Sequence, residues 1–272
     1  MSGRFINITT DLKALADPDL LHTFYYSPIG NMCFHGQCSY YCDSSHAICG
    51  NPDNLEASLA AFLPSKTLAP RKKVRNPWRQ SYNKHKNAEW FGHPDYCEYV
   101  KTIKPYHKGR RLLDIMDMAI LDFLMGNLDR HHYEIFKNFG DQSYIIHLDH
   151  GRGFGKPHFD EVKKLLAPLR QCCMIRARTL QQLLYFYEKS NTLSLGQTLK
   201  QSLKDDPVDP VLLDSHFEAI DRRVELVLKT VDKCLTKKHR SEVVFTSDEQ
   251  YDSGYSGQSD EEDEAFLNEN GH

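Results

Sequence analysis

The chain has 272 residues, of which 40% are hydrophobic and 26% charged, so it can bury one large core or two small ones. Its net charge of -3 hides an asymmetry, because ten acidic residues and no Lys or Arg follow Arg240, while 34 basic and 27 acidic residues precede that point. No apolar run approaches the roughly 18 residues of a membrane helix, and the sequence after Met1 lacks a signal-peptide pattern.

The first sixty residues contain weak helical signals around a cysteine-rich loop. Residues 5–28 have leucines at helical spacing and a turn at Ser27-Pro28, which predicts a weak amphipathic helix. The periodicity of Asn54–Leu63 predicts a second, short helix that stops at Pro64. Asn7-Ile8-Thr9 is a glycosylation sequon, which agrees with secretion but often occurs by chance.

The segment Arg71–Lys86 is strongly basic. It contains seven Lys or Arg residues, no acid, and the aromatic residues Trp78 and Tyr82. This composition permits nucleic-acid binding, but a solvated face or a surface that attracts acidic peptides is at least as consistent with it. Pro70 and Pro77 favour an extended course along the domain, and we expect no nucleic-acid partner.

The chain is organised around residues 117–154. A helix beginning near Arg110 carries a dense apolar run and stops at Gly126-Asn127. The polar loop Asp129–Glu134 follows, and then a turn at Gly140-Asp141. The alternating run Ser143–Leu148 predicts a strand that delivers Asp149 into a glycine-rich exit. Helix, acidic loop, hairpin and strand-end acid follow in the order of a protein-kinase catalytic loop and metal-binding loop.

Phosphoryl transfer gives each acid a task. One carboxylate orients the attacking hydroxyl, and a second holds a divalent cation that neutralises phosphate charge. Asp129 and Asp149 fit these tasks, while Glu134 stands where ordinary kinases have a metal-binding Asn. A cluster of Asp129 with His131, His132, His147 and His150 is the alternative, as a metal site of phosphoesterase type.

The remainder of the chain is helical in pattern, followed by an acidic end. Asp160–Leu166 predicts a helix ended by Pro168, and Thr179–Lys189 and Leu193–Leu203 predict two more. Ser215-x-x-Glu218 is a capping-box signature for the last helix. Residues 241–272 are acidic and poor in aliphatic residues, which predicts a disordered tail after a folded domain of residues 1–240. Ser247-Asp-Glu249 and Ser259-Asp-Glu261 are Ser-x-Glu matches in that tail.

Eight cysteines indicate disulfides and an oxidising compartment, because their number is even and half of them cluster in residues 33–49. Sequence alone leaves 105 pairings open. A zinc knuckle at 33–49 is the alternative, but the spacing lacks a paired CxxC.

Several short and uncommon sequence motifs resemble those of one kinase family. GNLDRHHYE followed by IIHLDHGRGFG, together with CSYYC, SLAAFLP, RNPWR, DYCE and PVLLDSHFEAIDRR, resembles the Golgi casein kinase group of atypical secretory-pathway kinases, the family with sequence similarity twenty. The resemblance covers roughly residues 5–240. It implies an α+β, protein-kinase-like C-lobe that is mainly helical with short β-hairpins and stapled by disulfides, in the Golgi lumen or secreted.

The resemblance also implies residue roles. Asp129 would be the catalytic acid/base, Asp149 would bind metal and nucleotide phosphate, and Glu134 would replace the missing Asn. ATP with Mn²⁺ or Mg²⁺ would be the cofactors, and the hinge beside adenine would be formed by Ala60, Ala61, Phe62 and Leu63, in place of the short helix. The implied disulfides are Cys33–Cys49, Cys38–Cys42, Cys97–Cys172 and Cys173–Cys234.

The expected function is transfer of the ATP γ-phosphate to Ser-x-Glu motifs of secreted proteins. No glycine-rich phosphate loop, strand lysine or partner glutamate is present, so most of an N-lobe is expected upstream and the isolated chain is expected to be inactive. Alternatives are a pseudokinase that activates a catalytic relative as a dimer, a xylose kinase of the same family, and a disulfide-rich secreted binding module.

Overall fold

The computed structural model describes residues 3–36, 42–58, 63–81, 83, 85–188, 193–248 and 251–255. The chain forms two units, one of residues 1–63 with 200–212 and one of residues 64–199 with 213–272. No helix within the described ranges is both long and apolar enough to cross a bilayer.

The first unit consists of short strands and single helical turns. Strand β1 (Gly3–Asn7) pairs antiparallel with β5 (Asn54–Ser58), and β2 (Tyr25–Tyr26), β3 (Met32–Phe34) and β4 (Ile48–Cys49) form a three-stranded sheet. Between them lie the helical turns η1 (Ile8–Leu12), η2 (Lys13–Leu15), α1 (Pro18–Leu21) and η3 (Ser44–His46).

Both helices expected from the periodicity of this region are therefore wrong. Residues 5–28 are interrupted because Asp17 caps a new turn at Pro18, with its carboxylate accepting the Leu20 N–H at 2.8 Å. Asn54–Ser58 is extended because it pairs along its length with β1, a long-range partner that overrides its helical spacing.

The second unit is mainly helical. Its strands are β6 (Arg71–Arg75), β7 (His132–Phe136), β8 (Ile175–Arg176) and β9 (Val244–Phe245). Its helices are α2 (Tyr96–Val100), α3 (Arg111–Met125), η4 (Lys137–Gln142), α4 (Val162–Leu165), α5 (Ala167–Cys172), α6 (Ala177–Tyr187), α8 (Asp214–Leu235) and α9 (Arg240–Val243). Helix α7 (Leu195–Leu203) spans the boundary between the two units.

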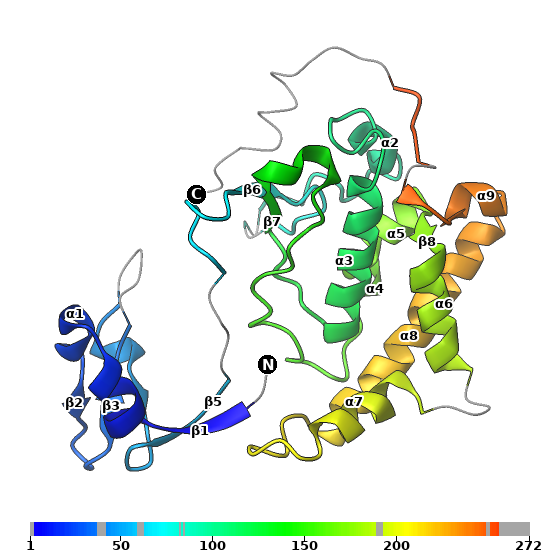
Figure 1. The fold of residues 1–272 in the computed structure, drawn as a ribbon. Coiled ribbons are helices and arrows are strands. Elements are labelled where there is room, and N and C mark those ends of the chain that lie inside the picture. Colours follow the sequence, from blue (N-terminus) through cyan, green and yellow to red (C-terminus); the bar gives the residue numbers. More distant parts are fainter. Residues whose placement is uncertain are drawn as a thin grey trace. The chain divides into compact units, whose positions relative to one another are not determined.

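Helix α3 is the centre of this unit and confirms the predicted core helix. It lies between the β6–β7 pair and the long helix α8 (Figure 1). Leu112, Leu113 and Met116 are fully buried in one apolar cluster, while Phe123 packs in a second cluster with Val227 of α8. Because α3 joins both clusters, its C-terminal end is held at a fixed place, and the acidic loop follows directly from it.

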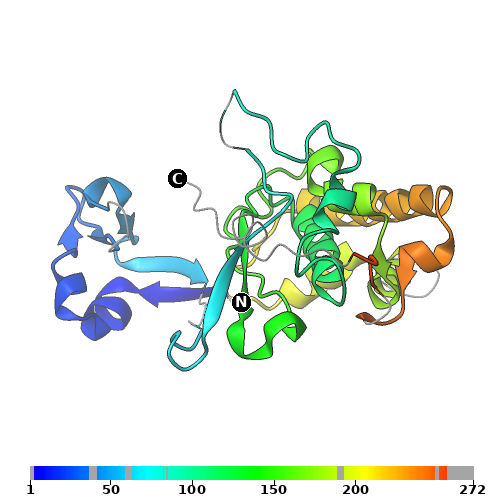
Figure 2. The same ribbon diagram turned by 90° about the horizontal axis from the view of Figure 1, so that it is seen from above.

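The predicted hairpin after the acidic loop is only partly present. Strand β7 pairs with β6, which lies alongside it when the molecule is seen from above (Figure 2). The run 143–148 touches β7 through one isolated bridge, in which the Ile146 N–H donates to the Glu134 carbonyl at 2.8 Å. The basic segment beginning at Arg71 thus supplies the strand partner that we expected from residues 143–148.

The expected helices 179–189, 193–203 and the last helix exist, with shifted ends. Pro168 lies in the first turn of α5 instead of ending the helix before it. Helix α8 starts at Asp214, so Ser215 is inside it and is not the cap.

The expected disordered tail from residue 241 needs correction. Helix α9 and strand β9 follow Arg240, and β9 pairs parallel with β8. Asp248 forms an ion pair with Arg176 at 2.7 Å, and Tyr251 is 5% exposed in the core around α3. Buried apolar side chains thus hold residues 241–248 and 251–255 on the body, and residues 256–272 lie outside the described part.

Candidate active site

The acidic loop begins at a glycine-capped helix end. Gly126 has a left-handed φ of 72°, which lets the Asn127 N–H turn back and donate to the Asp122 carbonyl at 2.8 Å. Arg223 of α8 is 2% exposed and donates from Nη1 to the Leu124 carbonyl at 3.1 Å. A Cβ at position 126 would lie 3.1 Å from this guanidinium, so both the left-handed backbone and the close contact favour glycine there.

Arg223 also fixes the segment beyond the glycine-rich exit. Its Nε donates to Asp160 at 2.8 Å and its Nη2 to the Lys156 carbonyl at 2.9 Å. Burial alone would raise the pKa of Asp160, but hydrogen bonds from Arg222 and Arg223 outweigh burial and lower that pKa. Asp160 therefore stays ionised, and the exit loop is tied to the end of α3.

A buried polar network underlies the loop itself. The Arg130 guanidinium donates to both Asp122 carboxylate oxygens, at 2.9 and 2.8 Å, and both side chains are nearly fully buried. Asn127, which is 0% exposed, accepts the Asp129 N–H at 3.0 Å and donates to Asp122 at 3.3 Å. Asn76 adds a hydrogen bond to the Arg130 carbonyl at 2.9 Å. These bonds fix the backbone on both sides of Asp129.

The Asp129 carboxylate lies at the edge of this buried network and is partly exposed. Its side chain is 21% exposed, accepts a hydrogen bond from His131 Nε2 at 2.8 Å and forms an ion pair with Arg152 Nε at 2.9 Å. Arg152 itself is 72% exposed, so this pair lies at the solvent boundary and opens easily. The Asp129 carboxylate borders a cavity of about 470 Å³ that is also lined by Ser81, Lys156, Lys164 and Leu165.

Asp149 lies in a strained turn next to this loop. Its φ of 58° is left-handed, a conformation that costs free energy for a non-glycine residue and is concentrated at functional sites. The residue before it, Leu148, offers its carbonyl to Arg130 Nη1, and the residue three positions after it is Arg152. Arg130 and Arg152 therefore connect the Asp129 loop to the Asp149 loop.

The Asp149 carboxylate is available to a ligand. The residue is exposed, and among the described side chains none forms an ion pair or hydrogen bond with it. Two neighbouring histidines are constrained by their surroundings. Burial and the Arg130 charge lower the pKa of His147, and His150 contacts Arg130 at 3.2 Å and the His147 carbonyl at 3.2 Å.

Glu134 lies on β7 and forms an ion pair with Arg71. It is opposite Lys73 in the β6–β7 register, and its carboxylate accepts from Arg71 Nε at 2.9 Å. Arg71 is only 10% exposed and also donates to the Pro64 carbonyl at 2.7 Å. The strand pairing thus places a partly buried arginine on the acid that we expected at the nucleotide site.

Much of the basic segment around β6 is structural. Arg75 is 3% exposed and forms an ion pair with Glu89, and Trp78 is 3% exposed in the core. Trp78 also donates from Nε1 to Gln171 at 2.6 Å. Since neither side chain faces solvent, the segment offers a much smaller surface to nucleic acid or to an acidic peptide than its composition suggests.

Several predicted residues fall at the edge of the described part. Ala60, Ala61 and Phe62 lie outside it, and only Leu63 of the expected hinge is described, at 36% exposure. Asn7 caps a helical turn by accepting the Thr9 and Thr10 N–H groups at 3.0 and 2.9 Å. Its glycosylation remains a prediction.

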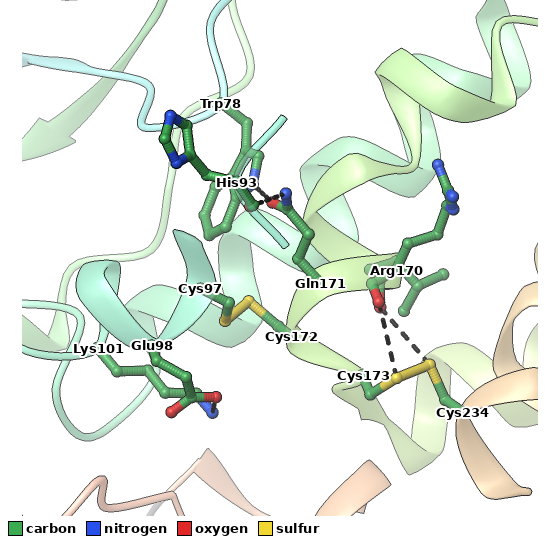
Figure 3. Close-up of a disulfide and its surroundings, with 11 residues drawn as sticks. Trp78, His93, Cys97, Glu98, Lys101, Arg170, Gln171, Cys172, Cys173 and Cys234 are labelled. Carbon is green, nitrogen blue, oxygen red and sulfur yellow. Dashed lines mark hydrogen bonds and ion pairs between the residues drawn. A yellow bond between two sulfur atoms is a disulfide. The ribbon is translucent and has the colours of Figure 1, made fainter. Parts of the chain in front are cut away.

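The cysteine pairs in the structure are those that the family resemblance implies. Cys33–Cys49 joins β3 to β4, Cys97–Cys172 joins α2 to α5, and Cys173–Cys234 joins the end of α5 to α8. Figure 3 shows the last two side by side. The pair Cys38–Cys42 involves Cys38, which lies outside the described residues.

The two alternative metal sites are disfavoured. Within the described ranges no three His, Cys, Asp or Glu side chains come together as a metal-binding group, including those around Asp129. Cys33 and Cys49 are bonded to each other, so their thiolates are not available for a zinc knuckle.

Three important residues were not singled out from the sequence. Asp122 and Arg223 lie on predicted helices, and Arg71 in a basic run. Arg223 carried a usable signal, because a charged residue on the buried face of an amphipathic helix needs a specific partner. The pairing of Arg71 with Glu134 depends on strand pairing across 63 residues, which no local pattern reveals.

Comparison with known proteins shows which sequences and structures this chain resembles. The model of the Golgi casein kinase, C-terminal, Fam20 family matches residues 1–243. The chain is 53% identical over 243 residues to the Drosophila melanogaster "Extracellular serine/threonine protein CG31145", covering 89% of this chain and 46% of the relative. It is 51% identical over 245 residues to the human "Extracellular serine/threonine protein kinase FAM20C", covering 90% of this chain and 41% of the relative.

Other relatives have different named activities. The mouse "Pseudokinase FAM20A" is 45% identical over 94% of this chain and 47% of its own length. The human "Glycosaminoglycan xylosylkinase" is 43% identical over 85% of this chain and 54% of its own length. The chain thus spans about half the length of the curated relatives that it matches.

A solved structure gives the fold. The crystal structure of the Golgi casein kinase with Mn/ADP bound superposes with a TM-score of 0.83 at 45% identity, over 89% of this chain and 58% of that chain. The same kinase-like fold is therefore present here. From the family model, these identities and the shared fold together, the chain belongs to the Fam20 family, within its Golgi casein kinase C-terminal domain.

Proposed function

We propose that this chain is the C-lobe of a secretory-pathway serine/threonine protein kinase that transfers the ATP γ-phosphate to Ser-x-Glu motifs of secreted proteins. The main observation that supports this proposal is that Arg130 and Arg152 connect the loops of Asp129 and Asp149. One loop then presents a carboxylate that orients a hydroxyl, and the other presents a carboxylate free for a cation, as phosphoryl transfer requires.

The donor set fits ATP with Mn²⁺ or Mg²⁺. These cations prefer carboxylate oxygens, and Asp149 is exposed without a side-chain partner among the described residues. When bound, the metal neutralises charge on the phosphates. Asp149 and Glu134 would hold the nucleotide phosphates. The family resemblance implies that Ala60, Ala61, Phe62 and Leu63 form the hinge for the base. Glu134 enters this role only if its pair with Arg71 loosens or if Arg71 itself approaches the phosphates.

Asp129 acts as the catalytic acid/base. Its carboxylate accepts the proton of the substrate serine, or orients that hydroxyl, as the γ-phosphate is transferred. His131 holds one carboxylate oxygen in place. Arg152 covers the other and moves aside when the serine hydroxyl enters, which its 72% exposure allows.

The disulfides support the proposed compartment. Three disulfides within the described residues fit the oxidising Golgi lumen or the extracellular space and not a reducing cytosol. Asn7 would be glycosylated there, and a dimer with a family pseudokinase is the partner that the family suggests.

The test uses the complete protein, since the chain spans about half the length of its relatives. The complete protein should transfer phosphate from ATP to a Ser-x-Glu peptide, and Asp129→Ala should abolish transfer without changing the unfolding midpoint. Asp141→Ala, which removes an exposed acid outside the site, is the matched control. Residues 1–272 alone should be inactive. Full activity of Asp129→Ala would sink the assignment.

A pseudokinase partner is the second candidate, and one observation favours it. The chain's own arginines occupy both Asp129 and Glu134. If the complete protein binds a catalytic relative and raises that relative's activity while transferring no phosphate itself, this function replaces the first. Transfer to a xylose acceptor in place of the serine peptide would instead assign the sugar-kinase activity.

A further inference from the structure

A second cavity, of about 660 Å³, shares α4 as a wall with the cavity beside Asp129 and is strongly basic. We call it the basic groove. Its cations come from three separate elements, α4, α5 and the C-terminal end of α8 with the residues after it: Lys163, Arg170, Lys233, Lys237 and Lys238. A loop of residues 90–94 forms another wall, and none of the described residues that line the groove is acidic.

Among the described residues, the five cations have no acidic partner. In the part of the chain that the structure describes, none of them pairs with a carboxylate, and Arg170 only approaches the Lys163 carbonyl at 3.5 Å. In the same unit Arg176, Arg222, Arg223 and Lys164 all have acidic partners. Lys163, Arg170 and Lys233 lie in the last turns of α4, α5 and α8, where a cation complements the C-terminal dipole, but that effect does not require three helix ends to meet at one groove. Gathering like charges on separate elements raises their mutual repulsion and favours an anionic ligand.

The groove is held in shape before any ligand arrives. Gln171 donates from Nε2 to the Trp90 and His93 carbonyls at 3.2 and 2.9 Å, which ties the 90–94 loop to α5. The disulfide Cys173–Cys234 ties α5 to α8 and lines the groove (Figure 3). Arg170 lies on α5 and His93 in the 90–94 loop, the two elements that Gln171 joins (Figure 3). A preformed site loses little conformational entropy when a ligand binds.

The short helix α4 lines both the groove and the candidate catalytic cavity. Val162 and Lys163 of α4 line the groove, whereas Lys164 and Leu165 line the cavity beside Asp129. A helix with its side chains is about 10–12 Å across. An extended peptide, at about 3.3 Å per residue, spans that width in about four residues.

We propose that the basic groove binds an acidic segment of the protein substrate at a site remote from the phosphorylated serine. Carboxylates would pair with the five cations, and an apolar side chain of the peptide would pack against Phe91, which is 51% exposed, and Val162. This apolar wall favours a peptide over a sulfated glycan, because a sulfated sugar chain has no aliphatic side chain to bury. The inference rests on the proposed function only in naming the peptide as a substrate.

The binding experiment uses residues 1–272 and a fluorescent peptide rich in glutamate, with one leucine and no serine. Anisotropy should show binding that weakens with added salt. Lys233→Glu with Lys237→Glu should weaken binding by about tenfold or more, because two attractive charges become repulsive. The matched control, Lys137→Glu with Lys204→Glu, reverses two exposed lysines outside the groove and should leave the dissociation constant within about twofold.

Two further arms define the ligand. Replacing the peptide leucine by serine should weaken binding, and a heparin fragment of equal charge should bind more weakly than the peptide. Equal effects of the two lysine pairs, or no effect of either, would overturn the groove as the site. Tighter binding of heparin, with no contribution from leucine, would assign the groove to a sulfated glycan and overturn the peptide.

A kinetic arm separates this inference from the proposed function. In the complete protein, the same double substitution should raise KM for a substrate with an acidic segment beyond the Ser-x-Glu site, with kcat unchanged. KM for a short Ser-x-Glu peptide should not change. If the complete protein transfers no phosphate but the groove still binds the acidic peptide, the proposed function fails and the groove stands.

Discussion

Arg130 holds the buried carboxylate of Asp122 with two hydrogen bonds of 2.9 and 2.8 Å, and the same guanidinium reaches the Leu148 carbonyl beside Asp149. One arginine thus links the end of α3, the Asp129 loop and the Asp149 loop. Since Arg130 follows Asp129 directly in the chain, any loss of this link should disturb both candidate catalytic acids together.

Removing Asp122 should therefore cost stability as well as activity. Asp122→Ala leaves a buried guanidinium without its counter-ion, which typically costs about 3–5 kcal/mol of the free energy of unfolding. Urea unfolding of residues 1–272 measures this loss. Glu225→Ala, which breaks the surface pair with Lys229, is the control and should leave the unfolding midpoint unchanged. Equal midpoints for the two variants would show that the Asp122–Arg130 pair does not hold the loops.

The fold should become less stable in mild acid because of His132. Burial, followed by nearby positive charges including Lys73, lowers the pKa of His132 to about 4, whereas an unfolded histidine titrates near about 6.5. Between these values the unfolded chain binds the extra proton. Stability is thus complete above the unfolded pKa and falls as the pH drops toward about 4.

His132→Gln should flatten this dependence, since glutamine does not titrate. The measurement is the urea midpoint of both chains between about pH 7 and about pH 4.5. If the two curves run parallel throughout that range, His132 does not carry the effect.

The paired cysteines should contribute more than their size suggests. Cys97–Cys172 closes a sequence separation of 75 residues and Cys173–Cys234 one of 61, so each strongly restricts the unfolded chain. Replacing either pair by serines should lower the free energy of unfolding by about 2–5 kcal/mol. Cys33–Cys49 closes only 16 residues and should contribute less to unfolding. A larger loss from the short pair would contradict this ordering.

Truncation should place the end of the folded domain after residue 240. Residues 1–240 lack Val243, which is fully buried, strand β9 and Tyr251, and should lose about 3 kcal/mol or more of stability. Residues 1–255 keep these contacts and should unfold like the complete chain. Thermal unfolding of the two truncations, compared side by side, decides the boundary. Equal stability of both would restore the disordered tail from residue 241.

Local signals predicted the helices well because their information is contiguous. The apolar run of α3 and its stop at Gly126 lie within one stretch, and so do the stripes of α6 and α8. The uncommon motifs in and around the acidic loop indicated the family, and the comparisons confirm it.

Long-range pairing explains what the sequence did not reveal. Strand β7 pairs with β6 in place of residues 143–148, and this pairing brings Arg71 into an ion pair with Glu134. The acidic composition after Arg240 suggested disorder, but Val243 and Tyr251 are buried and Asp248 found Arg176. In each case, the conformation of a few residues depends on a partner that is distant in the chain. The average composition of the segment does not reveal such a partner.

The most direct test separates the tasks of the two acids. Mn²⁺-dependent nucleotide binding by the complete protein, measured calorimetrically, should be lost in Asp149→Asn and kept in Asp129→Asn, while phosphate transfer to a Ser-x-Glu peptide is lost in both. Such a split would assign the cation to Asp149 and the hydroxyl to Asp129. Unchanged nucleotide binding by Asp149→Asn, or transfer by Asp129→Asn at the unsubstituted rate, would contradict the catalytic centre described here.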